Sequence, residues 1–359
     1  MKKICFAFNH FQFSDGVARA ALGIANHLAE KQNMEITLRP IFLCDQEMVK
    51  GLSQNIKVEP VFKFYFRGLS KVINMLPDFL LHKLVFRKEY DIEIGFQYGT
   101  ATVAAGSYGK GKRAKHFIWI HTYDDGLKFK RYYLKADKVI CVSKCNAERF
   151  EKETKGKIPV AYCYNAINDE AVRESANEMI ELKRPNVPLF VSVGRHSPEK
   201  GYLRLLDCLY KLKKDGFSFK VWLIGNGPQH NELIEYSKKL ELEEEVIFLG
   251  EKQNPHAYTS KADVFLCPSY AEGYSTACTE AIMLGVPVIT TCVSGGKEII
   301  EDAECGMLTE MDDISYYNAL KYILQNPQLV DEWKETLKKT RERFSYKTRI
   351  SKLDKILEI

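Results

Sequence analysis

The stretch that decides the fold is Ala262–Ile300, ADVFLCPSYAEGYSTACTEAIMLGVPVITTCVSGGKEII. Its short apolar run, Val264–Cys267, predicts a buried strand. A helix is expected over Thr276–Leu284, with Ser275 as its N-cap, and a second strand over Val286–Thr290. The stretch is therefore one strand–helix–strand unit. Its loop lies at the carboxyl end of a strand, where open α/β sheets bind ligands.

Two carboxylates frame that loop. Glu272 lies within it, and Glu280 follows near the second turn of the expected helix. The amino end of the helix would attract an anion such as a diphosphate, and Gly273 lets the backbone come close to it. A pair of glutamates is more often a solvated surface feature. The surrounding strands, loop and helix nevertheless favour a ligand site.

At these residues the sequence resembles the family-4 retaining glycosyltransferases of GT-B architecture, of the bacterial surface-polysaccharide type. The signature of that family is Glu-x7-Glu in this setting. Further residues stand where such enzymes place similar ones: Ala262-Asp263, Pro268-Ser269, Glu280-Ala281, Gly285, Pro287-Val288 and Gly295-Gly296. The resemblance implies an α/β fold of two Rossmann-like domains facing across a cleft, with a C-terminal helix that crosses back to the N-terminal domain.

The resemblance also implies roles for the residues of this loop. Glu280 would hold the ribose hydroxyls of a sugar nucleotide, and Glu272 would lie beside the donor sugar. Gly273, Tyr274 and Ser275 would complete the donor-binding loop. Tyr274 departs from the phenylalanine that is commoner in the family, and its hydroxyl contacts either the sugar or water.

A basic loop, GRHSPEKG at 194–201, follows the strand expected over Leu189–Val193. Arg195 and Lys200 are five residues apart and can place two cations over one phosphate pair. Such a loop is usually an exposed basic turn. The resemblance implies instead that both cations hold the donor diphosphate and act as the principal catalysts.

Glycines follow several of the expected strands. Gly194, Gly225 and Gly227 lie in the second half of the chain and are expected at the nucleotide, and Gly16 lies at the start of the first helix. Glycine at such a turn permits close approach of a ligand, but it is equally explained by the turn itself. The family commonly has Gly-Gly and a following Glu near Gly16, so the part of Asp15-Gly16 in acceptor or phosphate contact stays open.

His121 ends the strand expected over Phe117–His121. Most lone histidines are structural, but the resemblance implies that this one reaches the donor sugar. Nothing near Asp124-Asp125 completes a coordination shell, and GT-B enzymes generally need no metal. No metal and no cofactor is therefore expected besides the nucleotide-sugar substrate.

The length of 359 residues suits two domains. We expect an N-terminal acceptor-binding domain at 1–170, a C-terminal sugar-nucleotide domain at 186–345, and a helix at 346–359 that packs on the first domain. No apolar run approaches the ~20 residues that span a bilayer. The ten cysteines are scattered without paired spacing, which is typical of reduced thiols in a cytoplasmic protein.

The first half of the chain is basic. Residues 1–170 hold 27 Lys and Arg against 18 Asp and Glu, a net charge of +9. Within it, Val61–Arg87 interleaves aromatic residues with cations that include Lys63, Arg67 and Lys71. The segment is either an amphipathic helix on an anionic membrane surface or a helix packed on the N-terminal sheet. No nucleic acid partner is expected.

These observations predict a retaining, metal-independent glycosyltransferase. It would move a hexose or N-acetylhexosamine from a nucleotide sugar, with UDP favoured, to a glycan or lipid-linked glycan in cell-surface polysaccharide synthesis. The expected location is the cytoplasm, with peripheral attachment to the inner face of the membrane. The alternatives are a non-catalytic two-domain protein that binds sugar nucleotides, or a GT-B epimerase or inverting transferase.

Overall fold

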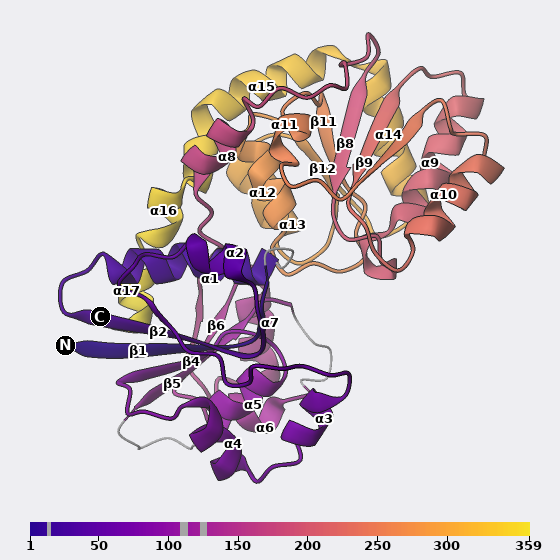
Figure 1. The fold of residues 1–359 in the computed structure, drawn as a ribbon. Helices are drawn as coiled ribbons and strands as arrows, with labels where there is room; N and C mark the ends of the chain where they lie inside the picture. The colour runs from indigo at the N-terminus through magenta and orange to yellow at the C-terminus, as the bar shows by residue number, and fades with distance from the viewer. Residues whose placement is uncertain (13–15, 108–113, 123–127) are drawn as a thin grey trace. The chain divides into compact units, whose positions relative to one another are not determined.

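A computed structural model describes residues 1–12, 16–107, 114–122 and 128–359. The predicted features at Ser14-Asp15 and Asp124-Asp125 lie outside these residues. The chain divides into two compact units (Figure 1). Unit 1 comprises Met1–Ile167 and Arg349–Ile359, and unit 2 comprises Asn168–Thr348.

Unit 1 is built on a parallel sheet of seven strands in the order β3-β2-β1-β4-β5-β6-β7. The strands are β1 (Lys2–Phe11), β2 (Met34–Cys44), β3 (Lys57–Val58), β4 (Ile92–Gly95), β5 (Lys115–Ile120), β6 (Lys138–Cys141) and β7 (Val160–Tyr162). The central strands are buried on both faces, as their nearly continuous apolar sequences require.

The helices of unit 1 cover both faces of this sheet. They are α1 (Gly16–Ala29), α2 (Gln46–Lys50), α3 (Leu69–Ile73), α4 (Asp78–Val85), α5 (Thr100–Gly106), α6 (Lys130–Tyr133), α7 (Lys144–Thr154) and α17 (Leu353–Leu357). Helices α4, α5 and α6 lie together on one face, and α1 and α17 lie on the other (Figure 1). Asp354 of α17 accepts from His27 of α1 and from Lys31 just after that helix, which joins the C-terminus to this unit.

Unit 2 has a parallel sheet of six strands in the order β10-β9-β8-β11-β12-β13. The strands are β8 (Leu189–Val193), β9 (Lys220–Ile224), β10 (Val246–Gly250), β11 (Val264–Cys267), β12 (Val288–Thr291) and β13 (Met307–Thr309). Both sheets therefore run third, second, first, fourth, fifth, sixth in chain order, which is the Rossmann order. The predicted α/β class with two Rossmann-like domains is confirmed.

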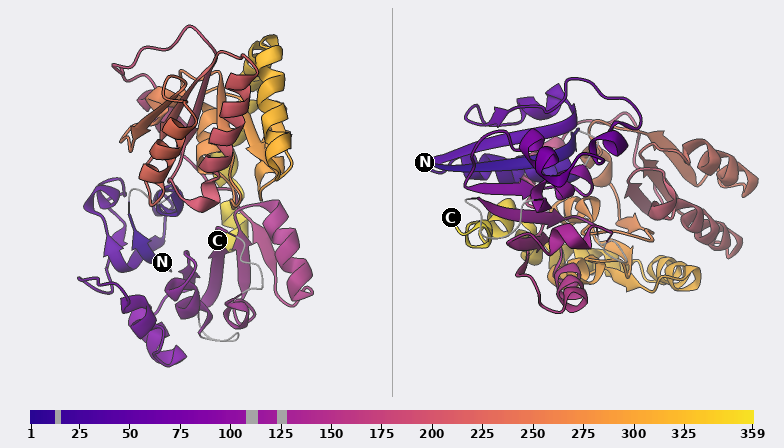
Figure 2. Two further views of the ribbon diagram at one scale, coloured as in Figure 1. Left: turned by 90° about the vertical axis from the view of Figure 1, so that its right-hand side faces the viewer. Right: turned by 90° about the horizontal axis from the view of Figure 1, so that it is seen from below.

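Unit 2 also carries helices on both faces of its sheet. Its helices are α8 (Asp169–Ser175), α9 (Tyr202–Lys214), α10 (His230–Lys239), α11 (His256–Thr259), α12 (Thr276–Met283), α13 (Gly296–Ala303), α14 (Asp313–Gln325) and α15 (Gln328–Thr340), with short 3-10 turns at Pro198–Lys200 and Arg341–Phe344. Helices α9, α10 and α14 cover one face, and α8, α11, α12 and α13 cover the other (Figures 1 and 2).

Three segments differ from the sequence-based expectations. Val61–Arg87 is not one helix: α3 begins only after Gly68, which has a left-handed φ of 101°, and Pro77 starts the separate helix α4. The expected linker contains α8, which Asn168 caps through the Ala171 N–H. The C-terminal helix is divided into α16 (Tyr346–Ile350) and α17.

All ten cysteines are free thiols. In the described part of the chain, no helix combines the length and the apolar character that crossing a bilayer requires.

Candidate functional site

The candidate site lies at the centre of the unit 2 sheet. Strands β8 and β11 are neighbours there, and the chain proceeds outward from β8 to β9 and β10 but from β11 to β12 and β13. This is the topological switch point, where the loops beyond the carboxyl ends of the strands diverge and leave room for a ligand. The basic loop, residues 194–201, follows β8, and the glutamate loop, residues 268–275, follows β11.

The two loops are packed against each other. The Tyr270 N–H donates to the Glu199 carbonyl at 2.8 Å. Gly201 has a φ of 69°, and a Cβ added there would lie 2.1 Å from the Pro268 carbonyl oxygen. Only glycine fits at that contact. The loops are thus held together by backbone contacts, which fixes the separation of the side chains they carry.

Lys200 and Glu272 form an ion pair across these loops, with 2.6 Å between Nζ and Oε1. The Ser269 hydroxyl donates to the same carboxylate oxygen at 2.8 Å. Burial by itself lowers the pKa of Lys200, but the Glu272 carboxylate more than offsets this and raises it above its ordinary value. Lys200 is therefore a fixed cation across the physiological pH range.

Arg195, the other predicted cation, lies exposed in the basic loop. Glu199 of the same loop accepts from the Ser197 hydroxyl at 2.6 Å. Burial raises the pKa of Glu199, but that hydrogen bond and the nearby cations lower it overall. The structure thus brings Lys200 and Glu272 into contact and leaves the Arg195 side chain open to solvent.

Glu280 lies in α12 and is only 6% exposed. Its Oε2 is 3.4 Å from Nε2 of His256, a residue of α11 that the sequence analysis missed. The other ring nitrogen of His256 is 2.8 Å from the Ser175 hydroxyl of α8. His256 therefore lies next to the predicted ribose-binding carboxylate, and no sequence motif marks it because three separate helices bring the three residues together.

The predicted donor glycines hold the loops of this edge together. A Cβ on Gly225, whose φ is 139°, would lie 1.9 Å from the Gly194 carbonyl oxygen. A Cβ on Gly227 would lie 2.5 Å from the His196 carbonyl oxygen. The His196 N–H donates to the Asn226 carbonyl at 2.9 Å. These close approaches explain the glycines without a ligand, so their predicted part in donor binding stays a prediction.

Ser275 caps α12 as predicted, with its hydroxyl 3.3 Å from the Cys278 N–H. Gly273 and Tyr274 precede the cap, and Tyr274 is buried. A Cβ on Gly295 would lie 2.9 Å from the Gly273 carbonyl oxygen. The glutamate loop is therefore closed on its other side by the glycine turn that starts α13.

Arg204 is a second residue that the sequence analysis missed. It is 3% exposed, and its Nε lies 2.8 Å from the Asp313 carboxylate of α14. Its guanidinium also lies over the Tyr270 ring, 3.8 Å from the centroid. A buried arginine that stacks on this loop fixes the conformation of the backbone before Glu272.

Two of the predicted site residues, Gly16 and His121, lie in unit 1. Gly16 begins α1. His121 directly follows β5 and packs on Phe96, with 4.7 Å between ring centroids. Burial lowers the pKa of His121 to about 3, although its hydrogen bond with the Phe96 backbone acts in the opposite direction. The imidazole is therefore neutral at pH 7.

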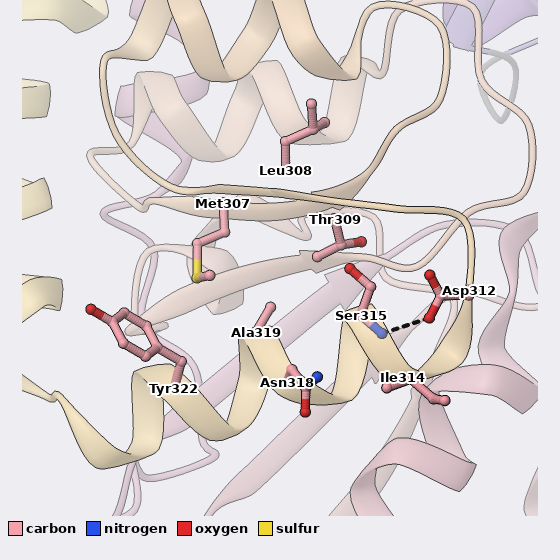
Figure 3. Close-up of a pocket in the computed structure, with 9 residues that line it drawn as sticks. All are labelled: Met307, Leu308, Thr309, Asp312, Ile314, Ser315, Asn318, Ala319 and Tyr322. Atoms are coloured by element: carbon pink, nitrogen blue, oxygen red, sulfur yellow. Dashed lines mark hydrogen bonds between the residues drawn. The ribbon is translucent and has the colours of Figure 1, made fainter.

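A shallow depression of about 500 Å³ lies elsewhere in unit 2, between β13 and α14 (Figure 3). Asp312 caps α14 there, accepting from the Ser315 N–H at 2.7 Å. None of the predicted site residues line it.

Comparisons with known proteins agree with this geometry. The family model described as "Glycosyl transferases group 1" matches residues 174–343. A Campylobacter jejuni protein named N-acetylgalactosamine-N,N'-diacetylbacillosaminyl-diphospho-undecaprenol 4-alpha-N-acetylgalactosaminyltransferase is 33% identical over 225 residues, which are 61% of this chain. The chain thus spans about three fifths, 59%, of the length of that relative.

Two further matches cover nearly the whole chain. An uncharacterized glycosyltransferase of Haemophilus influenzae is 24% identical over 342 residues, 92% of each protein. An Anabaena protein solved in complex with UDP-glucose superposes with a TM-score of 0.74 at 19% identity, covering 100% of both chains. At this identity the structural likeness shows the fold alone, and that fold is the GT-B arrangement of two Rossmann-like domains.

Proposed function

We propose, from the match of residues 174–343 to the group 1 glycosyl transferases, that this chain is a retaining glycosyltransferase of cell-surface polysaccharide synthesis. It moves a hexose or N-acetylhexosamine from a nucleotide sugar, with UDP as the nucleotide, to a glycan or lipid-linked glycan. The transfer needs no metal ion.

The observation that carries this proposal is the Lys200–Glu272 pair, 2.6 Å apart at the switch point of the unit 2 sheet. A permanent cation beside a carboxylate at the end of a parallel strand suits a substrate that joins a diphosphate to a sugar. The diphosphate competes with Glu272 for the ammonium of Lys200. Glu272 is then released toward the sugar hydroxyls, while Glu280 and His256 bind the ribose.

The reaction develops charge that these residues are placed to stabilise. The bond from the anomeric carbon to the diphosphate oxygen breaks, and a bond from the acceptor hydroxyl oxygen to that carbon forms on the same face. The departing phosphate oxygen takes the acceptor proton. Lys200 and Arg195 neutralise the negative charge on the leaving group, and one well-placed charge of this kind lowers such barriers by about 3 kcal/mol. The contact of His121, a residue of unit 1, with the sugar stays a prediction.

The choice of donor and acceptor is supported by the relatives. The Campylobacter jejuni protein is named for an acceptor carried on diphospho-undecaprenol and for an α-linked product. The Anabaena structure contains UDP-glucose. A lipid-linked glycan and a UDP-sugar are therefore the first acceptor and the first donor to test with this chain.

The proposed attachment to an anionic membrane surface is supported by the segment Val61–Arg87. One row of its side chains packs inside unit 1, including Leu81 and Val85, both fully buried. Another row is exposed: Phe64 at 61%, Phe66 at 52%, Val72 at 57%, Met75 at 83% and Phe79 at 59%. The buried row agrees with packing on the sheet, and the exposed row supports the proposed membrane contact.

The exposed cations Lys63, Arg67 and Lys71 accompany that outer row. Each cation near an anionic leaflet contributes about 1 kcal/mol, so a few give reversible attachment. Flotation with vesicles that contain anionic lipid should recover the protein at low salt and release it as salt rises. Replacing the three cations by Glu should abolish recovery. A protein that ignores anionic vesicles would point to a soluble acceptor.

The decisive test of the function is nucleotide binding followed by product analysis. UDP should raise the melting temperature of the protein in the presence of EDTA more than GDP or ADP does. With a UDP-hexose and a lipid-linked glycan, the product should retain the α configuration of the donor. Stabilisation by GDP alone would contradict the choice of UDP, a divalent requirement would contradict metal independence, and a β product would indicate an inverting enzyme.

A further inference from the structure

Three side chains that commonly bind metal ions converge inside unit 1. His82 of α4 and His116 of β5 both direct Nε2 at the same carboxylate oxygen of Glu93 in β4, at 2.6 Å and 3.0 Å. One ligand atom from each residue lies within 4.8 Å of the others. The three residues come from different elements, so the cluster exists only in the folded chain.

The cluster is buried. The exposed fraction of the side chain is 13% for His82, 4% for Glu93 and 2% for His116. Glu93 and His116 are each the second residue of their strand, so the cluster lies at the amino ends of β4 and β5. Rossmann-like sheets bind substrates at the opposite edge. The cluster is therefore independent of the donor site proposed above.

A buried carboxylate requires a compensating positive charge. In the described part of the chain, the ion-pair partners of Glu93 are the two histidines, which carry charge only when protonated. Two imidazoles and one carboxylate are a common protein ligand set for Zn²⁺, with a water molecule as the fourth ligand. A divalent ion at this position would supply positive charge to the buried carboxylate through the same three side chains.

The separations are close to those that a zinc ion needs. With metal–ligand bonds of about 2.0 to 2.1 Å, a tetrahedral ion holds neighbouring ligand atoms about 3.3 Å apart. The observed 2.6 Å and 3.0 Å would have to widen by only about 0.7 Å and 0.3 Å. The two imidazole rings lie 5.8 Å apart between centroids at 70°, so they are inclined to each other rather than stacked and can both present Nε2 to one ion.

Asp137 lies beside His116, on the side of the ring where zinc sites commonly have an outer carboxylate. Its Oδ2 is 3.7 Å from Nδ1 of His116, on the side of the ring away from Glu93. The same oxygen accepts from the His116 backbone N–H at 2.8 Å. The backbone hydrogen bond thereby holds Asp137 near the His116 ring.

We propose that His82, Glu93 and His116 bind one zinc ion, which fastens helix α4 to strands β4 and β5. Helix α4 belongs to Val61–Arg87, the segment that carries the exposed row of apolar side chains. A metal at its base holds that segment to the sheet without taking part in sugar transfer.

The test uses the full chain without a histidine tag. After purification in zinc-containing buffer and gel filtration, metal analysis should find about one zinc per chain. Adding ZnCl₂ to EDTA-treated protein should raise its melting temperature by at least about 3 °C. His82→Gln, at the least buried ligand, should weaken zinc binding by more than about 100-fold, and Asp137→Asn by about 10-fold to 100-fold.

The matched control is His27→Gln. His27 also lies on a helix of unit 1 and pairs with a single carboxylate, that of Asp354 at 3.3 Å, and it is not among the residues grouped as a potential metal site. It should keep the zinc content and the response to ZnCl₂. Wild-type protein that retains less than about a tenth of an equivalent, or a His82→Gln variant that binds zinc as wild type does, would overturn the proposal. Stabilisation by UDP in EDTA is a separate measurement, so either proposal can fail alone.

Discussion

The two units share one strand order but differ in what lies at their switch points. In unit 2, the loops after β8 and β11 meet through an ion pair between Lys200 and Glu272. In unit 1, the ends of β1 and β4 meet through amides. Asn9 accepts from the Ala101 N–H at 3.0 Å and donates to the Tyr98 carbonyl, and Gln97 accepts from the His10 N–H at 2.9 Å.

This difference teaches that the Rossmann topology provides a place for a ligand but not its chemistry. A fixed cation and a carboxylate suit a diphosphate and a sugar. A network of amides closes the corresponding edge and supports the neighbouring loops. We call the strand ends that carry Lys200 and Glu272 the charged edge, and those that carry Asn9 and Gln97 the amide edge. Substitutions at the two edges should have different effects.

The largest expected effect is on turnover at the charged edge. Lys200→Met should lower kcat by about 10²-fold to 10³-fold, because the leaving diphosphate loses a preorganised charge. Steady-state transfer assays measure this. Lys297→Met is the control, since Lys297 is 70% exposed in α13 and pairs only with Glu301 among the described residues. A loss below about tenfold for Lys200→Met would remove Lys200 from the catalytic machinery.

The second prediction separates the two glutamates of the charged edge. Glu280→Ala should weaken UDP binding by about 1 to 3 kcal/mol, because buried hydroxyls lose their acceptor. Glu272→Ala should keep UDP affinity nearly unchanged and mainly lower kcat. Calorimetric titration with UDP gives the affinities. Equal losses of UDP affinity in both variants would contradict the assigned roles.

The third prediction concerns pH and unit 1. Burial lowers the pKa of folded His121 to about 3, below its value of about 6.5 in the unfolded chain. The unfolded state therefore takes up the proton first, and the stability contributed by neutral His121 is present above pH 6.5 and is lost as the pH falls toward 3. Between pH 7.5 and 5.5 this amounts to about 1 kcal/mol.

His121→Gln should reduce that pH dependence by the same amount, as measured by urea unfolding at the two pH values. His27→Gln serves as the comparison, because His27 lies on α1 beside Asp354. An unchanged pH dependence in His121→Gln would mean that this imidazole is not buried in its neutral form.

The smallest expected effect is at the amide edge. Asn9→Ala removes an acceptor and a donor between β1 and the segment after β4, and should lower the free energy of unfolding by about 1 kcal/mol. UDP affinity should not change. Asn177→Ala should change neither, because Asn177 is exposed just after α8 and its side chain, among the described residues, donates to the Arg173 carbonyl of that helix. A loss of UDP affinity in Asn9→Ala would show that the amide edge also binds the donor.

The sequence by itself determined the elements of the charged edge. The apolar runs, the cap at Ser275 and the glycine turns predict the strands and α12 closely, because these are local signals of periodicity and capping. The spacing also places Glu272 in the loop at the end of a strand and Glu280 in the helix that follows. The late start of α3 after Gly68 and the break before α4 at Pro77 were not predicted, because the amphipathic pattern of Val61–Arg87 favoured one helix.

Only the tertiary structure decided which distant residues meet. His256 reaches Glu280 from another helix, Arg204 supports the glutamate loop from α9, and Glu93 gathers histidines from α4 and β5. Pairing of this kind depends on the register of the parallel strands and on how helices pack over them. No local pattern encodes those contacts, because each residue is ordinary in its own segment and acquires its role from neighbours that are remote in the chain.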